Sequence, residues 1–271
     1  MTKVLVISPK GGCGKSTFCF QILAPFFFER DADKSLILDL DTENNEHKTY
    51  TRSKLFDAVE LSLKNLDPTT FITKQNLIID TGAANLASKT LKALDEINFL
   101  KKIDLFCIPM TRGKQAMSSA LDIYDEIKEL NESAKVCFIL SDCYDEEDVP
   151  LEMQFIKFLG DKKHILSLDK EQGKFDELKK TDPQVSWIRI PSSPCLYWVS
   201  EYALTAYEFA DNLTDLEQKQ EQLAVELAES PENKAAYGLA TYKVILAKRC
   251  RSFRKNVLKD DVFKSLEKVL G

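Results

Sequence analysis

Short apolar runs alternate with longer amphipathic stretches along most of this chain. Six of the runs are rich in β-branched residues and almost continuously apolar, which is typical of strands covered on both faces of a sheet. We predict strands at Lys3–Ser8, Ser35–Leu40, Asn76–Asp80, Ile103–Pro109, Lys135–Ser141 and Val185–Ile190.

Amphipathic stretches with apolar residues at helical spacing lie between these runs. We predict helices at about Lys15–Glu29, Ala87–Phe99, Lys114–Asn131, Leu151–Leu159 and Gln172–Lys180. Strands and helices that alternate in this way predict an α/β fold with a doubly wound, mostly parallel sheet and right-handed crossovers.

The pattern changes after the last predicted strand. A helix is expected over about 196–213, and residues 213–271 contain no strand candidate. Two helical stretches in this part are separated by residues 229–233, and a further break is expected near residues 259–261. We therefore predict an α/β domain over residues 1–212 and a helical C-terminal extension over residues 213–271.

Composition narrows the class of protein. The chain has 271 residues, of which 44% are apolar and 30% charged, as expected for a soluble α/β domain with an appendage. No apolar run approaches the roughly 20 residues of a membrane span, and the first residues show no signal-peptide pattern. The seven cysteines are irregularly spaced without a CxxC pair, which argues against a disulfide framework and a zinc site. We therefore expect a cytoplasmic protein.

A glycine-rich segment follows the first predicted strand and precedes the first predicted helix. It reads Pro9-Lys10-Gly11-Gly12-Cys13-Gly14-Lys15-Ser16-Thr17 and holds three of the nine glycines of the chain. Backbone N–H groups of such a loop can wrap phosphate oxygens without Cβ clashes, and the positive end of the following helix points at the same anion. This context and the intact Gly-Lys-Ser-Thr core favour a nucleotide site over a glycine-rich turn, although Pro9 stands where the general P-loop pattern has glycine.

Two side chains of this loop indicate nucleotide chemistry. Lys15 can reach the β- and γ-phosphates, and the hydroxyl of Ser16 can bind Mg²⁺. We therefore predict that ATP or ADP is bound by Lys10, Gly11, Gly12, Cys13, Gly14, Lys15, Ser16 and Thr17.

Carboxylates follow two other predicted strands. Asp39 and Asp41 are separated by one residue at the end of the second strand, so both point into the crevice where α/β sheets bind ligands. Asp80 ends the apolar run Leu77-Ile78-Ile79, which is the Walker B arrangement that holds Mg²⁺ directly or through water. Each pattern alone also fits an acidic turn at a strand end. Together with the glycine-rich loop they predict a metal site that includes Ser16 and Asp80, to which the family resemblance described below adds Asp39.

The string Lys-Gly-Gly-Cys-Gly-Lys-Ser-Thr, beginning at Lys10, resembles the deviant Walker A motif of the ParA/MinD family of ATPases. The resemblance covers about residues 1–210. It implies that Lys10 crosses a dimer interface to the phosphates of the partner, that Asp41 orients the attacking water, and that Asp39 lies near the Mg²⁺ shell. A cation delivered on dimerisation would stabilise charge on the γ-phosphoryl group, as an arginine finger does. The alternative for Lys10 is an ordinary surface lysine. The predicted catalytic residues are Lys10, Lys15 and Asp41.

Two further positions are expected at the nucleotide. The backbone N–H of Gly82, soon after Asp80, can lie near the γ-phosphate. The resemblance implies that the end of the strand at residues 138–142 helps to hold the adenine ring and that Pro191 lies near the base.

The resemblance also has a departure. Partition proteins of the family usually follow the second aspartate with Pro-Gln, whereas this chain continues Thr42-Glu43-Asn44-Asn45. This run looks more like the TraL/StbB-like branch, which acts in plasmid transfer and stability. It leaves open whether Asn44 and Asn45 contact water, phosphate or the partner subunit.

Charge is unevenly distributed along the chain. The net charge is −6, yet residues 243–259 contain seven basic residues and no acidic one. We predict that this basic segment binds DNA phosphates without sequence specificity. The candidate DNA-binding residues are Lys248, Arg249, Arg251, Arg254 and Lys255. The alternative is a solvated helix face with Val244, Ile245, Leu246, Phe253 and Val257 packed inward.

The leading hypothesis is a ParA-like, Mg²⁺-dependent ATPase that forms a homodimer on ATP binding and positions or segregates DNA, in plasmid partition, stability or conjugative transfer. It would act in the cytoplasm, at the nucleoid, with a partner protein that stimulates slow hydrolysis. One alternative is a MinD-like, membrane-cycling ATPase that uses the amphipathic residues 262–270, which could equally dock on the protein itself. The other is a nucleotide-binding scaffold, against which the intact Lys10, Lys15, Asp41 and Asp80 argue. The sequence does not identify the cargo or the partner.

Overall fold

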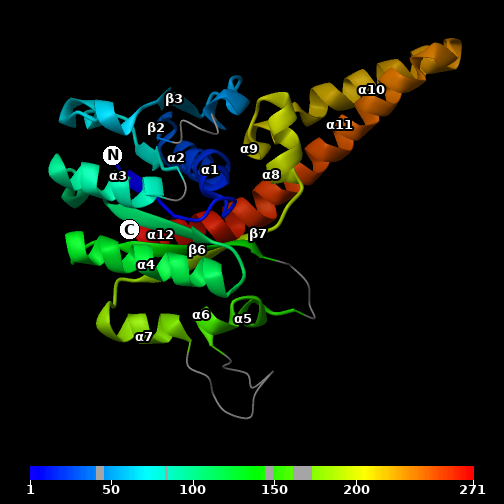
Figure 1. Cartoon of the computed structure of the whole chain (residues 1–271). Helices are drawn as coiled ribbons and strands as arrows, with labels where there is room; N and C mark the ends of the chain where they lie inside the picture. Colours follow the sequence, from blue (N-terminus) through cyan, green and yellow to red (C-terminus); the bar gives the residue numbers. More distant parts are fainter. Residues whose placement is uncertain (41–45, 83–84, 144–148, 161–172) are drawn as a thin grey trace. The chain divides into compact units, whose positions relative to one another are not determined.

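The computed structural model describes the chain except for residues 41–45, 83–84, 144–148 and 161–172 (Figure 1). The described residues form two compact units. The sheet unit consists of Met1–His47, Lys54–Ser192 and Ser265–Gly271. The helical unit consists of Lys48–Ser53 and Ser193–Lys264.

The sheet unit is built on one parallel sheet of seven strands, in the order β3-β2-β4-β1-β5-β6-β7. The strands are β1 (Lys3–Val6), β2 (Ser35–Asp39), β3 (Phe56–Glu60), β4 (Leu77–Asp80), β5 (Leu105–Met110), β6 (Val136–Cys143) and β7 (Ser186–Pro191). All six strands that we predict are present. Because β1 lies between β4 and β5, the crevice at the switch point of the sheet opens at the carboxyl end of β1.

The seventh strand, β3, was not predicted. It pairs with β2 at the edge of the sheet, and its Asp57 and Glu60 side chains are exposed. Charged residues are common on edge strands because they discourage pairing with other chains. They also remove the continuous apolar run by which the other strands were predicted.

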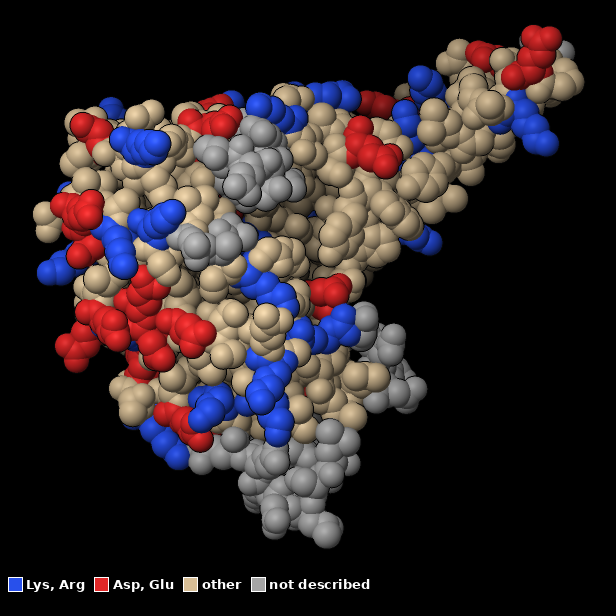
Figure 2. Space-filling view, viewed as in Figure 1, with Lys and Arg blue, Asp and Glu red and all other residues tan. Residues whose placement is uncertain are grey.

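Helices cover the sheet (Figure 1). Those of the sheet unit are α1 (Lys15–Thr17), α2 (Ala24–Asp31), α3 (Asn85–Glu96), α4 (Lys114–Leu130), α5 (Leu151–Gln154), α6 (Ile156–Leu159) and α7 (Lys174–Thr181). Short 3₁₀ segments occur at η2 (Glu46–Tyr50), η3 (Leu63–Asn65), η4 (Pro68–Phe71) and η5 (Leu100–Lys102). Charged side chains of these elements lie at the surface, as Figure 2 shows for one face.

Two predicted helices are interrupted. The first continues from α1 to α2 through the π-helical segment η1 (Phe18–Leu23), and Pro25 follows directly at the start of α2. Proline has no N–H to donate to the carbonyl four residues earlier, so a regular α-helix cannot continue unchanged through this position. The helix predicted at 151–159 is divided at Phe155, whose φ of −124° and ψ of 37° are not helical.

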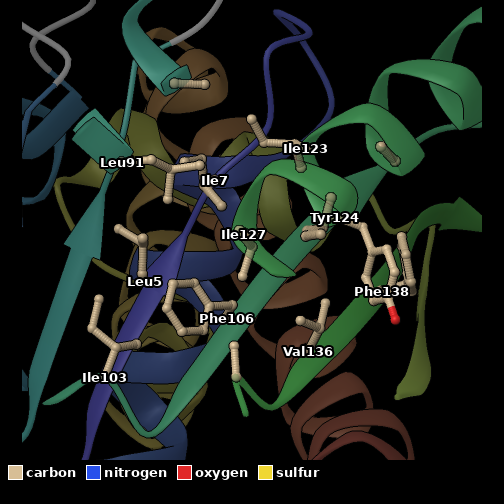
Figure 3. Close-up of a cluster of buried hydrophobic side chains, with 14 of the residues drawn as sticks. Leu5, Ile7, Leu91, Ile103, Phe106, Ile123, Tyr124, Ile127, Val136 and Phe138 are labelled. Atoms are coloured by element: carbon tan, nitrogen blue, oxygen red, sulfur yellow. The ribbon is translucent and has the colours of Figure 1, made fainter. Parts of the chain in front are cut away.

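One core cluster of the sheet unit lies between the sheet and helices α3 and α4. The side chains of η1 and the start of α2 are buried as well. Buried side chains of the central strands, among them Leu5, Phe106 and Phe138, point toward Leu91 of α3 and toward α4 (Figure 3). The buried residues of α4 are Ala116, Ala120, Ile123, Tyr124 and Ile127, which recur at helical spacing. This packing fixes the strands whose carboxyl ends form the candidate site.

The helical unit contains no strand among its described residues. Its elements are α8 (Cys195–Trp198), η6 (Val199–Tyr202), α9 (Ala206–Phe209), η7 (Ala210–Asn212), α10 (Leu213–Glu229), η8 (Pro231–Asn233), α11 (Lys234–Phe253) and the π-helical η9 (Arg254–Val262). Helix α12 (Phe263–Leu270) ends the chain. The helix predicted over 196–213 is therefore a series of short pieces.

The break predicted near residues 259–261 is wrong. The chain remains helical from α11 through η9 into α12, with Leu258 and Val262 buried. Buried apolar residues on both sides of the charged Lys259-Asp260-Asp261 sequence hold this segment in helical form.

The domain boundary predicted after residue 212 stays a prediction, whereas the two packing units meet after Ser192. No helix among the described residues is long and apolar enough to cross a bilayer.

Candidate functional site

The glycine-rich loop connects β1 to α1, as the sequence predicts. Gly12 has a φ of +69° and Gly14 a φ of +86°, a backbone conformation that residues with a Cβ rarely adopt. Gly14 also faces the end of β6, where a Cβ at this position would lie 3.5 Å from Ser141 Oγ. The two glycines therefore allow the chain to turn from the strand into the helix close to β6.

The two lysines of the loop are connected through one carbonyl group. Lys15 is buried, and its Nζ donates a hydrogen bond to the Lys10 carbonyl oxygen at 3.2 Å. The thiol of Cys13, also buried, donates to the same oxygen at 3.1 Å. The ammonium group of Lys10 has no hydrogen-bond or ion-pair partner within the part of the chain that the structure describes. Without nucleotide, the loop thus binds its own backbone and leaves the Lys10 side chain free.

Two buried aspartates stand side by side at the edge of the sheet that faces this loop. Asp80 of β4 is the register partner of Val6 in β1 and of Asp39 in β2. Both carboxylates are completely buried. Neither oxygen of Asp80 has a well-formed hydrogen bond to any described residue. This is rare for a buried carboxylate. The charged form of Asp80 is therefore costly unless a ligand binds it.

The electrostatics of Asp80 reflect this burial. Burial and the negative charge of Asp39 raise the pKa of Asp80 to about 7. The nearby Ser16 hydroxyl and the positive charge of Lys15 act in the opposite direction and lower it. Cys19 of η1 also lies next to this carboxylate. Burial, followed by the charges of Asp80, Cys107 and Asp39, raises the pKa of Cys19 well above its usual range. Near neutral pH, Asp80 is thus poised between its protonated and charged forms.

The residues present fit a bound Mg²⁺ ion. Mg²⁺ prefers one or two carboxylate oxygens, with the rest of its shell from water and nucleotide phosphates. Asp80 supplies carboxylate oxygens without partners, and the hydroxyl of Ser16 lies beside it. Asp39 lies next to Asp80 in the sheet. Among the described residues there is no cluster of three or more His, Cys, Asp or Glu side chains that could hold a metal by itself.

For the remaining residues predicted to bind nucleotide, the structure gives their burial and their place in the fold. Gly11 is exposed, Thr17 is half-buried, and Gly82 is buried directly after β4. Pro191 ends β7 and is the register partner of Cys143 in β6. The predicted water-positioning residue Asp41, with Asn44 and Asn45, lies outside the described residues.

The candidate DNA-binding residues belong to α11 and η9. Two of the five are occupied within the helical unit, because Lys248 pairs with Glu217 at 2.9 Å and Arg254 pairs with Asp211 at 2.7 Å. Arg254 also donates to the Tyr207 carbonyl oxygen and lies over the Tyr207 ring.

The other three candidates, Arg249, Arg251 and Lys255, are exposed and have no ion-pair partner among the described residues. Of the residues that the alternative interpretation packs inward, Val244, Leu246 and Phe253 are buried, Val257 is half-buried and Ile245 is exposed. The segment is therefore part core and part free basic surface.

Three of the five apolar residues in the C-terminal amphipathic segment are buried, whereas Val269 and Leu270 are partly exposed. Val262, Phe263 and Leu266 are each less than 5% exposed. In this conformation these three side chains are packed inside the protein and not available to a bilayer interface.

Sequence reasoning missed two neighbours of the site. Cys19 lies four residues after Lys15, so helical spacing alone could have placed it on the face of the helix that meets the strand ends. The approach of Ser141 to Gly14 could not be predicted, because it depends on the order of β1, β5 and β6 in the sheet.

Comparison with known proteins places the fold. No family model matches the sequence, and no curated protein matches it either. The structure is similar to that of apo McdA from Cyanthece, with a TM-score of 0.52 and 11% identity over 100% of both chains. McdA is a ParA/MinD-type protein. This chain has the ParA/MinD fold. At this level of identity the likeness concerns the architecture alone.

Two other solved structures are more weakly similar. One is a putative plasmid partition protein from Borrelia burgdorferi bound to AMPPNP, with 17% identity, a TM-score of 0.45 and coverage of 72% of this chain and 89% of that one. The other is the MinD cell division protein of Aquifex aeolicus, with 12% identity, a TM-score of 0.48 and coverage of 77% and 89%. In this chain the glycine-rich loop follows the carboxyl end of β1.

Proposed function

We propose that this protein is an ATP-hydrolysing switch of the ParA/MinD type. The observation that carries the proposal is Asp80, a fully buried carboxylate that lies beside Lys15 and Ser16 of the phosphate loop and has no well-formed hydrogen bond. Burial makes the charged form of this carboxylate costly unless a ligand compensates it, and carboxylates perturbed in this way cluster at functional sites. The ParA/MinD fold and the intact motif support the same function.

In this proposal each residue of the site has its own role in binding or hydrolysing ATP. The backbone N–H groups of the loop from Gly11 to Ser16 bind the phosphates. Lys15 donates to the β- and γ-phosphate oxygens with the two N–H groups that its hydrogen bond to the Lys10 carbonyl leaves available. Ser16 and Asp80 hold Mg²⁺, with Asp39 in the surrounding shell. The metal, when bound, neutralises charge that develops on the transferred phosphoryl group. Asp41 positions the attacking water.

Hydrolysis is coupled to dimerisation through Lys10. Its ammonium group contacts no other described group of its own chain, so it is available to a second copy. Insertion beside the γ-phosphate of the partner supplies positive charge where the transition state needs it. The ATP-bound dimer would be the active form of a positioning protein, and a partner protein that favours this arrangement would accelerate the reaction.

The dimer acts on DNA in this proposal. Arg249, Arg251 and Lys255 offer exposed positive charge for phosphate contacts that do not depend on base sequence. A few such contacts give weak, salt-sensitive binding, which suits a carrier that is released after hydrolysis. The cargo would be a plasmid or a conjugation complex, and the site of action the cytoplasm at the nucleoid.

Nucleotide binding and phosphate release test the proposal together. The full chain should bind ATP with Mg²⁺ and release phosphate, and the Asp80→Asn variant should lose the Mg²⁺ dependence of binding. Asp95→Asn is the matched control, since Asp95 is exposed on α3. Absence of ATP binding by the full chain, or an Asp80→Asn variant that keeps full turnover, would exclude this function.

A further inference from the structure

The helical unit presents an antiparallel pair of helices, α10 and α11, which lie side by side in Figure 1. Gln220 Nε2 donates to Thr241 Oγ1 at 2.9 Å, and Lys248 Nζ lies 2.9 Å from Glu217 Oε1. These contacts fix the two helices as a hairpin. In the view of Figure 2 much of the surface of this hairpin is uncharged.

Large apolar side chains are left uncovered on and beside this hairpin. Nine large hydrophobic residues are exposed among the described residues, and six of them belong to the helical unit. These six are Tyr197, Trp198, Val225, Leu239, Tyr242 and Ile245. Single exposed apolar residues are ordinary, but their concentration in one unit marks an interaction surface.

Three of them form a stripe along α11. Leu239, Tyr242 and Ile245 are spaced by three residues, so they lie on one side of the helix, and they are 53%, 40% and 47% exposed. Further along the same helix, Leu246 and Ala247 are buried. The ring of Trp198 on α8 lies 6.3 Å from that of Tyr242 and extends the apolar surface. The stripe thus leaves one side of α11 exposed, while α11 also packs against α10 in its own unit.

Gly238 provides a second, independent observation. It lies within α11 next to the stripe and is exposed, and a Cβ placed on it would meet nothing within 4 Å. A glycine inside a helix costs about 1 kcal/mol relative to alanine. Nothing in the described part of the chain requires it. The absence of a side chain is explained if the backbone of another helix approaches closely at this position.

Charge indicates what the partner is. Helix α10 carries five acidic residues and one lysine, whereas α11 carries five basic residues and no acidic one. A two-fold axis can place the acidic helix of each hairpin beside the basic helix of the other, and every contact then occurs twice. A second copy of the chain therefore supplies the complementary charge without any further component.

We propose that the α10–α11 hairpin binds the same hairpin of a second copy, independently of nucleotide. This contact goes beyond the proposed function, in which the dimer closes over ATP at the phosphate loop. Two copies already held by their hairpins would find each other at an effective concentration in the millimolar range, on the order that short flexible linkers give. ATP-dependent closure would then no longer require an encounter between free molecules.

Sedimentation of the full chain without nucleotide tests the proposal. The wild-type protein and its Lys15→Ala variant should both form dimers as their concentration rises from about 1 to 100 µM. Leu239→Glu should raise the dissociation constant at least tenfold, which corresponds to about 1.4 kcal/mol. Ile72→Glu is the matched control, because Ile72 is 79% exposed but belongs to the sheet unit, and it should associate like the wild type.

Gly238→Gln separates association from folding. Glutamine is a better helix former than glycine and its side chain would enter open space, so the melting temperature should stay the same or rise. Self-association should nevertheless weaken at least tenfold. A chain that remains monomeric throughout, or Leu239→Glu and Gly238→Gln variants that associate like the wild type, would overturn the proposal. So would dimerisation that requires ATP and is lost in Lys15→Ala, an outcome that leaves the proposed ATPase function intact.

Discussion

Lys15 Nζ donates a hydrogen bond to the carbonyl oxygen of Lys10, with 3.2 Å between the two atoms. The lysine that binds phosphate in P-loop proteins is therefore attached, without nucleotide, to the backbone of the lysine that the family resemblance places across a dimer interface. An ammonium group has three N–H donors, so Lys15 can keep this hydrogen bond while its other two donors reach phosphate oxygens. The backbone of Lys10 is thus connected through Lys15 to the phosphate site.

We predict that Lys10→Ala separates binding from hydrolysis. The substitution keeps the backbone carbonyl that accepts from Lys15 and Cys13 and removes an ammonium group without a partner in its own chain. Affinity for ATP should change by no more than a few-fold, whereas phosphate release should fall at least about 100-fold, as for loss of an arginine finger. Equilibrium titration with ATP and a phosphate-release assay measure the two effects. Unchanged turnover would identify Lys10 as an ordinary surface lysine.

Asp80→Asn should stabilise the nucleotide-free protein while abolishing its activity. The pKa of Asp80 is raised from 3.8 to about 7, so between these values the unfolded chain releases a proton that the folded chain keeps. The free-energy penalty for charging the buried Asp80 is therefore absent below pH 4. It grows as the pH rises and is complete above pH 7. Removing it should raise the free energy of unfolding by on the order of 2–4 kcal/mol at pH 8.

Urea denaturation of the wild type and of Asp80→Asn at pH 8 and at pH 4 measures this difference. The gain in the variant should be large at pH 8 and nearly absent at pH 4. The exposed Asp95→Asn control should show no gain at either pH. A variant that is less stable than the wild type at pH 8 would contradict the account of Asp80 as an uncompensated charge.

The free part of the basic segment should carry DNA binding. Replacing Arg249, Arg251 and Lys255 together by glutamate should abolish binding of duplex DNA by the ATP-bound protein, and each lost phosphate contact should lower the salt slope by about one. Fluorescence anisotropy at several salt concentrations measures this. Lys101→Glu with Lys102→Glu is the control, since both lysines are exposed in the sheet unit. Full DNA binding by the triple variant would remove this role from the segment.

Arg254 should behave differently from its neighbours. Its guanidinium donates to Asp211 and to the Tyr207 carbonyl oxygen and lies 4.9 Å from the centre of the Tyr207 ring. Arg254→Ala should therefore lower the free energy of unfolding by about 1–2 kcal/mol, mainly through the lost hydrogen bonds and ring contact. Thermal unfolding beside the Arg251→Ala variant, which should be nearly neutral, tests this. Equal stability of the two variants would show that the contacts of Arg254 contribute little.

Most of the strands could be predicted because their burial is recorded in short, continuous stretches of sequence. Six strands were found from continuous apolar runs, since central strands of a parallel sheet are buried on both faces. The edge strand β3 escaped because Asp57 and Glu60 break its apolar pattern. The interruption of the first helix is local as well, because Pro25 removes a backbone donor.

The site was predictable to the extent that strand ends define it. The glycine-rich loop follows β1, and Asp39 and Asp80 are the last residues of β2 and β4. Parallel strands bring such ends to one edge of the sheet. What the sequence could not provide was the register that pairs Asp39 with Asp80, or the proximity of Ser141 to Gly14, because both depend on the order of the strands. The pairing of Arg254 with Asp211 likewise joins residues 43 positions apart.

Phosphate release from ATP, measured against protein concentration, tests the central claim most directly. A switch whose partner supplies Lys10 should show a rate per molecule that rises with protein concentration until the dimer is saturated. The Lys15→Ala variant should release no phosphate above background at any concentration. If the full chain released no phosphate, or if Lys15→Ala released it at the wild-type rate, this protein would not be a ParA/MinD-type ATPase.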